Sequence, residues 1–228
     1  MTTATLTDTD IRVRDAVLRQ LEWDPEVDAS AIGVAANDSV VTLTGYVDTY
    51  SGKLAAERAA KRVRGVRGVA NDINVRPKLA RTDVDVARDA VHALEVRSTV
   101  PDTVQAVVHN GYITLTGKVN SVFQQRDAEK AVRYIKGIHG VFNHVDVAPG
   151  AVSRDVHHRI VEALHRNADV DARHVTVTIS GGAASLTGTV TTWLQRDAAE
   201  RAAANAPGIT RVNNQLVVEP TELVDEIC

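Results

Sequence analysis

The chain has 228 residues, of which 44% are hydrophobic and 24% are charged, and its formal net charge is −3. This composition is typical of ordered α/β domains rather than of a disordered chain, and it lacks the positive excess of a general nucleic-acid-binding protein.

The only cysteine, Cys228, is the last residue, so the chain cannot form an internal disulfide. No apolar run approaches the roughly 18–20 residues that span a bilayer. The first ten residues lack the basic and apolar regions of a signal peptide. These features predict a cytoplasmic protein, with the inner membrane surface as a peripheral location.

A short motif occurs three times along the chain. It is VVTLTGYV at 40–47, ITLTGKV at 113–119 and ASLTGTV at 184–190, and its glycines are 72 and 71 residues apart. This spacing predicts three repeated units. Because a domain of this size buries only about 60% of its unfolded surface, each unit is marginally stable alone, and docking between units would stabilise it.

The first unit begins with apolar residues at helical spacing, namely Ile11, Val17, Leu18 and Leu21. A short strand at 32–35, a turn at Asn37-Asp38 and the first LTG strand then predict a hairpin. A second helix is expected over roughly 49–64 and ends at Gly65, where a left-handed glycine would terminate it. An apolar strand at 68–77 closes the unit.

The second unit follows the same order. Thr82 can cap a helix whose apolar stripe we expect in the core, formed by Val84, Ala87, Val91 and Leu94. A strand at 104–108, an Asn110-Gly111 turn and the second LTG strand come next. A helix over roughly 121–136 ends at Gly137, and a strand at 140–149 closes the unit.

The third unit repeats the pattern once more. After Ser153 the helical stripe is Val156, Ile160 and Leu164, followed by a strand at 175–179 and a Gly181-Gly182 turn. The second helix is expected over roughly 191–206 with Gly208 at its end, and the closing strand covers 211–220.

These elements predict an α+β fold of three tandem αββαβ units, at residues 8–77, 82–149 and 152–220. Each unit is expected to be a small three-stranded mixed sheet with both helices on one face. Three asparagines align in the closing strands, Asn71, Asn143 and Asn214. Six glycines have predicted structural roles, as bulges or close backbone approaches in the LTG strands and as helix ends: Gly45, Gly117, Gly188, Gly65, Gly137 and Gly208.

The repeated motifs resemble the BON domain, a family named after osmotically inducible and nodulation proteins. The matching segments are LTGYV…GVRGVANDINV, LTGKV…GIHGVFNHVDV and LTGTV…GITRVNNQLVV, which together cover nearly the whole chain. The resemblance implies a non-enzymatic module associated with osmotic or envelope stress and with phospholipid binding. A relative that binds potassium makes potassium the one cofactor that the resemblance suggests, and the residues themselves predict none.

The predicted second helix of the first unit has an amphipathic division at 100° per residue. Its basic residues cover one side and its alanines the other, while an apolar tip projects from the basic side. We therefore predict that this side binds anionic phospholipid, where each cation is worth about 1 kcal/mol. The predicted lipid-binding residues are Tyr50, Lys53, Leu54, Arg58, Lys61, Arg62 and Arg64.

An ordinary solvated helix face is the alternative explanation of this pattern. The corresponding helix starts in the other units carry Phe123 and Trp193-Leu194. These are candidates for membrane or inter-unit contacts, and packing between units is the favoured interpretation of Trp193.

Other chemistry is weakly indicated. Gly65-Val-Arg-Gly68 and Gly137-Ile-His-Gly140 fit the G-x-x-G pattern of KH domains, but that loop joins two helices, whereas this one joins a helix to a strand. We therefore expect no nucleic-acid partner. The chain has no nucleophile elbow or Walker loop, so no catalytic residue is predicted.

A metal site is not predicted either. His158 and His165 are seven residues apart, too far for a helical pair of ligands. The acidic groups Asp24/Glu26/Asp28 and Asp169/Asp171 could in principle hold a cation, but such groups are commoner as solvated turns.

Three hypotheses for the function follow. The first is a stress-associated binding protein that docks on anionic phospholipid. The second is a sensor of potassium or of a small ligand. The third is a scaffold whose units bind one another or a protein partner.

Overall fold

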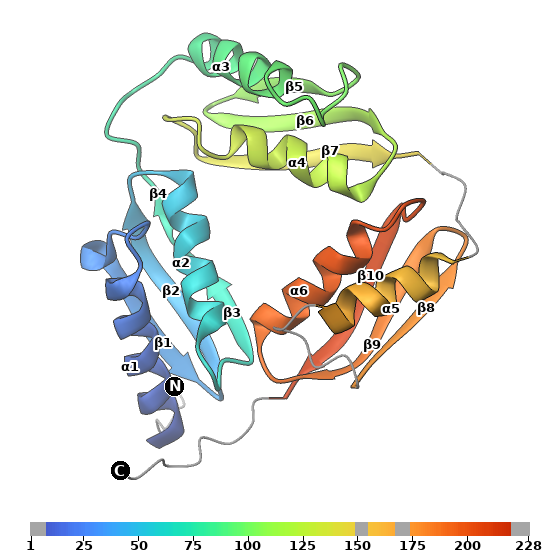
Figure 1. The fold of residues 1–228 in the computed structure, drawn as a ribbon. Helices are drawn as coiled ribbons and strands as arrows, with labels where there is room; N and C mark the ends of the chain where they lie inside the picture. Colours follow the sequence, from blue (N-terminus) through green and yellow to red (C-terminus); the bar gives the residue numbers. More distant parts are fainter. Residues whose placement is uncertain (1–7, 149–154, 167–173, 220–228) are drawn as a thin grey trace, which may run out of the picture.

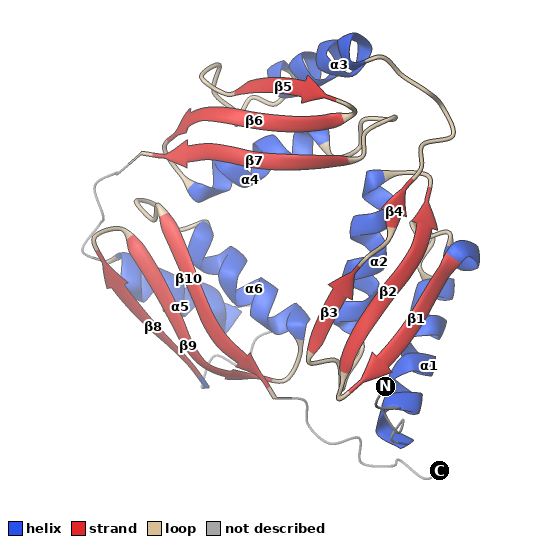
Figure 2. Cartoon of the chain, turned by 180° about the vertical axis from the view of Figure 1, so that it is seen from behind, coloured by secondary structure: helices blue, strands red, loops and turns tan. Residues whose placement is uncertain are grey.

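The structure, a computed structural model, describes residues 8–148, 155–166 and 174–219. They form three αββαβ units, which confirms the predicted α+β class. In each unit the two helices cover one face of the sheet and leave the other face open (Figure 1, Figure 2). The predicted boundary near Gly150 lies outside the described residues.

The first unit contains two α-helices and one sheet. Its elements are α1 (Asp8–Trp23), the short 3₁₀ helix η1 (Ala29–Ala31), β1 (Ile32–Asn37), β2 (Val40–Val47), α2 (Tyr50–Arg62), β3 (Gly68–Asn71) and β4 (Asn74–Val75). The closing strand is divided into β3 and β4, but both pieces pair with β2 in the same parallel register. β1 and β2 pair antiparallel.

The second and third units have undivided closing strands. The second contains α3 (Asp83–Glu95), β5 (Gln105–His109), β6 (Tyr112–Val119), α4 (Val122–Val132) and β7 (Gly140–Val147). The third contains α5 (Val156–Arg166), β8 (Val175–Ser180), β9 (Ala183–Val190), α6 (Trp193–Ala204) and β10 (Arg211–Val218). In both, the LTG strand lies in the middle, antiparallel to one neighbour and parallel to the other.

The hairpin turn of the first unit differs from the prediction by one residue. Asn37 pairs with Val40, so the turn is Asp38-Ser39, with φ of 48° and 63°. The buried carboxylate of Asp10 accepts the Ser39 N–H at 3.0 Å and holds this turn against α1. The other two turns are Asn110-Gly111 and Gly181-Gly182, as predicted, and they also have positive φ at both positions.

The second helices end earlier than the sequence predicted, at Arg62, Val132 and Ala204 instead of 64, 136 and 206. The backbone tightens after each of them. The N–H groups of Val63, Ile135 and Ala206 donate to carbonyls three residues back, at 3.1–3.2 Å. These bonds form a tight turn of the 3₁₀ type that leads into the terminal glycine.

The stripe predicted for the first helix of the second unit is only partly in the core. Leu94 is buried, but Val84 and Val91 are 68% and 47% exposed. The buried stripe is Val86, Ala90 and Leu94 instead. α3 has two adjacent apolar stripes about 100° apart, and the sheet covers only one of them.

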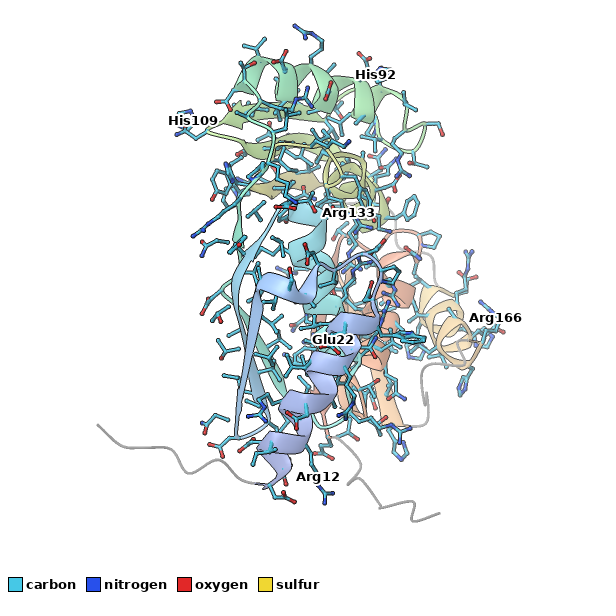
Figure 3. The ribbon with its side chains drawn as sticks, turned by 90° about the vertical axis from the view of Figure 1, so that its left-hand side faces the viewer. Arg12, Glu22, His92, His109, Arg133 and Arg166 are labelled. Carbon is cyan, nitrogen blue, oxygen red and sulfur yellow. The ribbon has the colours of Figure 1, made fainter. Side chains whose placement is uncertain are left out.

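The three units form a ring in which α2, α4 and α6 lie on the inside and α1, α3 and α5 lie toward the outside (Figure 1). Seen from the side, the strands of the first unit lie toward one side of the ring and α1 and α5 toward the other, while α3 lies along its top (Figure 3). Each unit has its own apolar core between its helices and its sheet. The inner helices therefore lie where the units can contact one another.

Candidate functional site: the inward face of α2

The sequence of α2 explains both its beginning and its buried side. The Thr49 side chain caps the helix by accepting the Gly52 N–H at 3.0 Å. Ala56, Ala59 and Ala60 are fully buried in the core of the first unit and let the helix lie close to the sheet, and Ala55 is buried as well. The opposite side of α2 carries the residues predicted to bind lipid.

Tyr50, the first residue of α2, contacts the neighbouring unit. It is half-buried and packs against the core of the second unit. Burial raises the pKa of its phenol, and the negative charge of Glu129 on α4 adds to this effect. Tyr50 thus anchors the first unit to the second.

Trp193 occupies the same position at the start of α6, and it packs against the core of the first unit. The Lys61 ammonium lies 5.6 Å from its ring centroid and the Arg196 guanidinium 5.1 Å, both within the range of cation–π contacts. The Trp193 indole N–H is buried without a hydrogen-bond partner among the described residues. The interpretation of Trp193 as an inter-unit contact agrees with this placement.

Lys61 therefore lies between two units rather than on an open surface. Its ammonium also pairs with Glu57 at 2.7 Å, and its side chain is 26% exposed. Nearby on α6, burial raises the pKa of Asp197, while the charge of Lys61 opposes that shift. The position of Lys61 makes it part of the contact between the first and third units.

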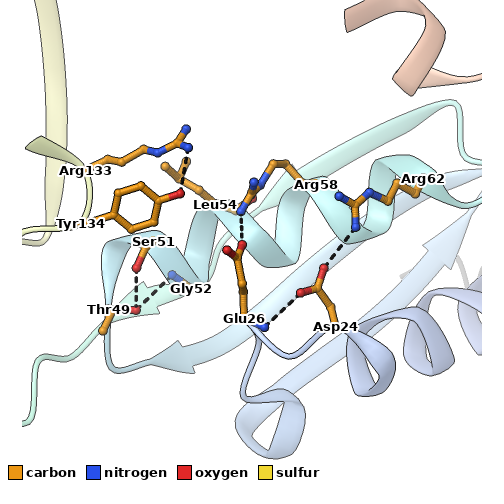
Figure 4. A network of polar contacts seen from close by, with 10 residues as sticks. All are labelled: Asp24, Glu26, Thr49, Ser51, Gly52, Leu54, Arg58, Arg62, Arg133 and Tyr134. Atoms are coloured by element: carbon orange, nitrogen blue, oxygen red, sulfur yellow. Dashed lines mark hydrogen bonds and ion pairs between the residues drawn. The ribbon is translucent and has the colours of Figure 1, made fainter. Parts of the chain in front are cut away.

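Two other cations of α2 pair with the loop that follows α1. Arg58 binds Glu26 at 2.5 Å and Arg62 binds Asp24 at 3.3 Å, and these arginine side chains are 42% and 47% exposed (Figure 4). The Arg58–Glu26 pair is exposed on both sides, and pairs of this kind are worth about 1 kcal/mol or less. Arg58 can therefore exchange Glu26 for another anion at little cost. The Asp24 side chain is only 11% exposed, so the Arg62–Asp24 pair is held more firmly.

The remaining predicted lipid-binding residues vary in exposure. Arg64 is exposed beyond the end of α2, while Lys53 and Leu54 are half-buried. In Figure 4, Leu54 lies on the same side of the helix as Arg58, whose Nε donates to the Leu54 carbonyl at 3.4 Å. Arg58, Arg62 and Arg64 are therefore accessible to solvent, whereas Tyr50 and Lys61 form contacts between units.

The second and third units contact each other through α4 and α6. The Arg126 guanidinium pairs with the Glu200 carboxylate across this junction. A polar cavity of about 350 Å³ lies beside the pair, lined by residues of both helices. Phe123, also predicted as an interaction residue, is 38% exposed near the start of α4.

The three aligned asparagines have a common role that their alignment alone did not reveal. Asn71, Asn143 and Asn214 each donate to a main-chain carbonyl of the second helix in their own unit, at 2.8–3.2 Å. Each also donates to a glutamate on that helix: Glu57, Glu129 or Glu200. The asparagines therefore attach each closing strand to the inner helix.

The helix-end glycines have the predicted backbone conformation, with φ of 89° at Gly65, 86° at Gly137 and 82° at Gly208. The LTG glycines also have positive φ, and each approaches a main-chain carbonyl closely. The destabilising effect of substituting these glycines stays a prediction.

Among the described residues, no cluster of three or more His, Cys, Asp or Glu side chains could hold a metal ion. Asp24 and Glu26 pair with arginines, and Asp28 caps η1. Asp169 and Asp171 lie outside the described residues. Within the same ranges, the helices are too short or too polar to cross a membrane.

Fold and site together define a tandem array of small αββαβ modules docked through their inner helices. The sequence matches the BON domain over residues 9–77, 83–149 and 155–220, and the chain belongs to the BON domain family. It is similar to the osmotically-inducible protein Y of Escherichia coli (strain K12), with 27% identity over 124 residues. That alignment covers 51% of this chain and 62% of the relative's length.

Two structures of CdsD, a structural protein of the type III secretion system of Chlamydia trachomatis, also align with the chain at 15% identity. One alignment covers 91% of this chain and 92% of the other, with a TM-score of 0.28. The second, to the C-terminal domain of CdsD, covers 92% and 98% with a TM-score of 0.27. At these TM-scores the similarity supports no inference about this chain.

Proposed function

We propose that this chain is a non-enzymatic, stress-associated binding protein that docks on anionic phospholipid surfaces. Its membership of the BON domain family and its similarity to an osmotically inducible protein support the association with stress. The observation that supports lipid docking is the accessibility of three arginines, Arg58 and Arg62 on α2 and Arg64 just beyond its end. Cations near an anionic membrane contribute about 1 kcal/mol each.

The proposed docking surface is smaller than the sequence predicted. Tyr50 and Lys61 pack between units, so they cannot contact a membrane while the ring stays closed. Leu54 is half-buried and adds limited apolar area. The proposal therefore depends on the arginines and implies weak, salt-sensitive binding.

Co-sedimentation with liposomes tests this proposal. The double variant Arg62→Glu/Arg64→Glu should bind vesicles of phosphatidylglycerol and phosphatidylcholine at least tenfold more weakly than the natural chain at low salt. The charge-matched control is Arg159→Glu/Arg166→Glu on α5, where both side chains are exposed; it should bind like the natural chain. Binding should disappear on pure phosphatidylcholine, and equal loss in both double variants would contradict the assignment to α2.

A protein-interaction scaffold is the second candidate. The contacts of Tyr50, Lys61 and Trp193 between units favour it, because they use part of the predicted lipid face to hold the modules together. Absence of binding to anionic vesicles at low salt, combined with self-association that depends on concentration, would favour the scaffold over lipid docking.

A further inference from the structure

An apolar groove lies on the outside of the second unit, between the end of α3 and strand β5. Its volume is about 420 Å³, which is within the range of ligand-binding sites. The larger apolar side chains that line it are those of one leucine and four valines: Val91, Leu94, Val100, Val104 and Val107. Leu94, Val100 and Val104 form a buried floor, while Val91 and Val107 are 47% and 60% exposed at the sides.

The charged residues at this groove are acidic. Glu95 and Asp102 are exposed and line it, and no lysine or arginine does. The nearby Arg97 is directed to another carboxylate, since it pairs with Asp127 at 3.6 Å. A partner for this groove should therefore combine apolar side chains with positive charge.

β5 adds a free backbone edge to the groove. The strand order is β5-β6-β7, so β5 pairs with β6 on one side only within the described part of the chain. His109 and Tyr112 flank the two-residue turn and form a hydrogen-bonded pair, as is usual for such hairpins. Because bonding alternates along an antiparallel strand, the N–H and C=O groups of Ala106 and Val108 point to the open side. Ala106 also lines the groove.

We infer that this groove and the free edge of β5 bind an extended peptide segment with alternating apolar residues and basic flanks. The segment adds a fourth strand to the sheet of the second unit. Its backbone pairs with Ala106 and Val108, its apolar side chains occupy the valine-lined groove, and its basic flanks face Glu95 and Asp102. Strand addition of this kind takes affinity from main-chain hydrogen bonds and specificity from alternate side chains.

The second unit differs from the first in the exposure of its first helix. In both units the loop after the first helix is tied to the second helix, by Arg58–Glu26 and Arg62–Asp24 in the first unit and by Arg97–Asp127 in the second. Of these two first helices, both within the described residues, only the one in the second unit carries an exposed apolar stripe, which supplies Val91 to one wall of the groove. An exposed valine on a helix beside an unpaired strand is a surface that a partner strand can cover.

The test uses the full chain and a fluorescein-labelled peptide of alternating valine and threonine with two lysines at each end. Fluorescence anisotropy should show saturable binding at 25 °C. Replacing the flanking lysines with glutamates should weaken binding at least tenfold, because Glu95 and Asp102 then repel the flanks. Absence of saturable binding of the lysine-flanked peptide up to millimolar concentration would overturn the proposal.

Two chain variants locate the site. Val91→Lys should weaken peptide binding at least tenfold, whereas Val84→Lys, on the same helix but outside the groove, should leave it unchanged. Ala106→Pro removes only the outward N–H of β5, which an edge strand tolerates, and should also weaken binding at least tenfold. If Ala106→Pro fails to fold, the pair of valine variants decides. Binding that is equal in Val84→Lys and Val91→Lys refutes the groove.

Peptide binding is independent of the proposed lipid docking. The Arg62→Glu/Arg64→Glu variant should bind the peptide like the natural chain, because those arginines lie in another unit. Loss of peptide binding in that variant would contradict the location in the second unit.

Discussion

Gly188 in the third LTG strand lies where no side chain fits. A Cβ atom there would be 2.0 Å from the carbonyl oxygen of His174, and the φ of 119° is unfavourable for any other residue. Gly45 and Gly117 have the same environment, because a Cβ atom added there would lie 2.0 and 2.1 Å from the carbonyl oxygens of Ala31 and Thr103. The repeated glycine thus permits close contact between the LTG strand and the start of its hairpin partner.

Gly188→Ala should destabilise the protein by more than the roughly 1–2 kcal/mol that a left-handed backbone alone costs a non-glycine residue, because main chain must move to relieve the contact. Gly181→Ala is the control in the same unit, since it also has positive φ but nothing lies within 4 Å of its Cβ position. Urea unfolding of both variants measures the difference. Equal losses would show that the carbonyl contact has no energetic effect.

Asp83 has a pH-dependent role at the start of α3. Its carboxylate accepts the N–H groups of Gly111 and Asn110 at 2.9 and 2.8 Å, and these two bonds lower its pKa. A lowered pKa means that the folded state favours the charged form. The resulting stabilisation is present above the ordinary aspartate pKa and is lost as the pH falls through the lowered value.

Asp83→Asn should therefore reduce the thermal midpoint at pH 7, and the difference from the natural chain should shrink as the pH falls from about 5 to below about 3. Thermal unfolding followed by circular dichroism across this range checks it. Asp146→Asn, at an exposed position on β7, serves as the control. A difference that stays constant with pH would mean that the charge of Asp83 does not contribute.

At the scale of elements, each closing strand is tied to the inner helix by one asparagine. In the third unit, Asn214 donates to the Arg196 carbonyl at 3.2 Å and to the Glu200 carboxylate at 2.9 Å, and it accepts the Leu216 N–H at 3.2 Å. The equivalent bonds of Asn71 and Asn143 show that this link belongs to the repeat. It connects β10 with α6 independently of the apolar core.

Asn214→Ala should lower the free energy of unfolding by about 1–3 kcal/mol, because it leaves partly buried hydrogen-bonding groups without a partner. The adjacent Asn213→Ala should change stability by less than about 0.5 kcal/mol, since that side chain is exposed on the other face of the sheet. Chemical denaturation of the two variants compares neighbours within one strand. An equal effect of both would contradict the proposed link.

At the scale of the whole molecule, contacts between the inner helices close the ring. The first residue of α2, Tyr50, packs on the second unit, and its counterpart on α6, Trp193, packs on the first. The Arg126–Glu200 pair joins the second and third units. Contacts of this head-to-tail kind generate closed rings when the rotation between units closes.

Trp193→Ala should open the junction between the first and third units. It should also lower the free energy of unfolding by about 2 kcal/mol, because the variant no longer buries the aromatic surface of the indole. Small-angle X-ray scattering should then show a larger radius of gyration. Leu194→Ala, at the next position and 38% exposed, is expected to leave the scattering unchanged. A closed, equally stable Trp193→Ala variant would show that the other two junctions suffice.

The sequence predicts which residues of α2 are buried and which face outward, but it does not predict how accessible the outward residues are. The helical spacing places the cations of α2 on one side, and the structure agrees that its alanines are buried. The spacing does not say what lies opposite that side. Lys61 faces Trp193 from a different unit, and Arg58 and Arg62 meet acidic residues from the loop after α1.

The sequence by itself determined the three αββαβ units, their hairpins and their glycine-terminated helices, because these depend on residues close together in the chain and recur three times. The tertiary structure decided which of the two apolar stripes of α3 is buried, which partners the cations of α2 take, and how the ring closes. Those outcomes depend on side chains from distant parts of the chain. A local sequence pattern cannot predict how such side chains are placed relative to one another. Tyr50 and Lys61 therefore received their roles only when the units were packed together.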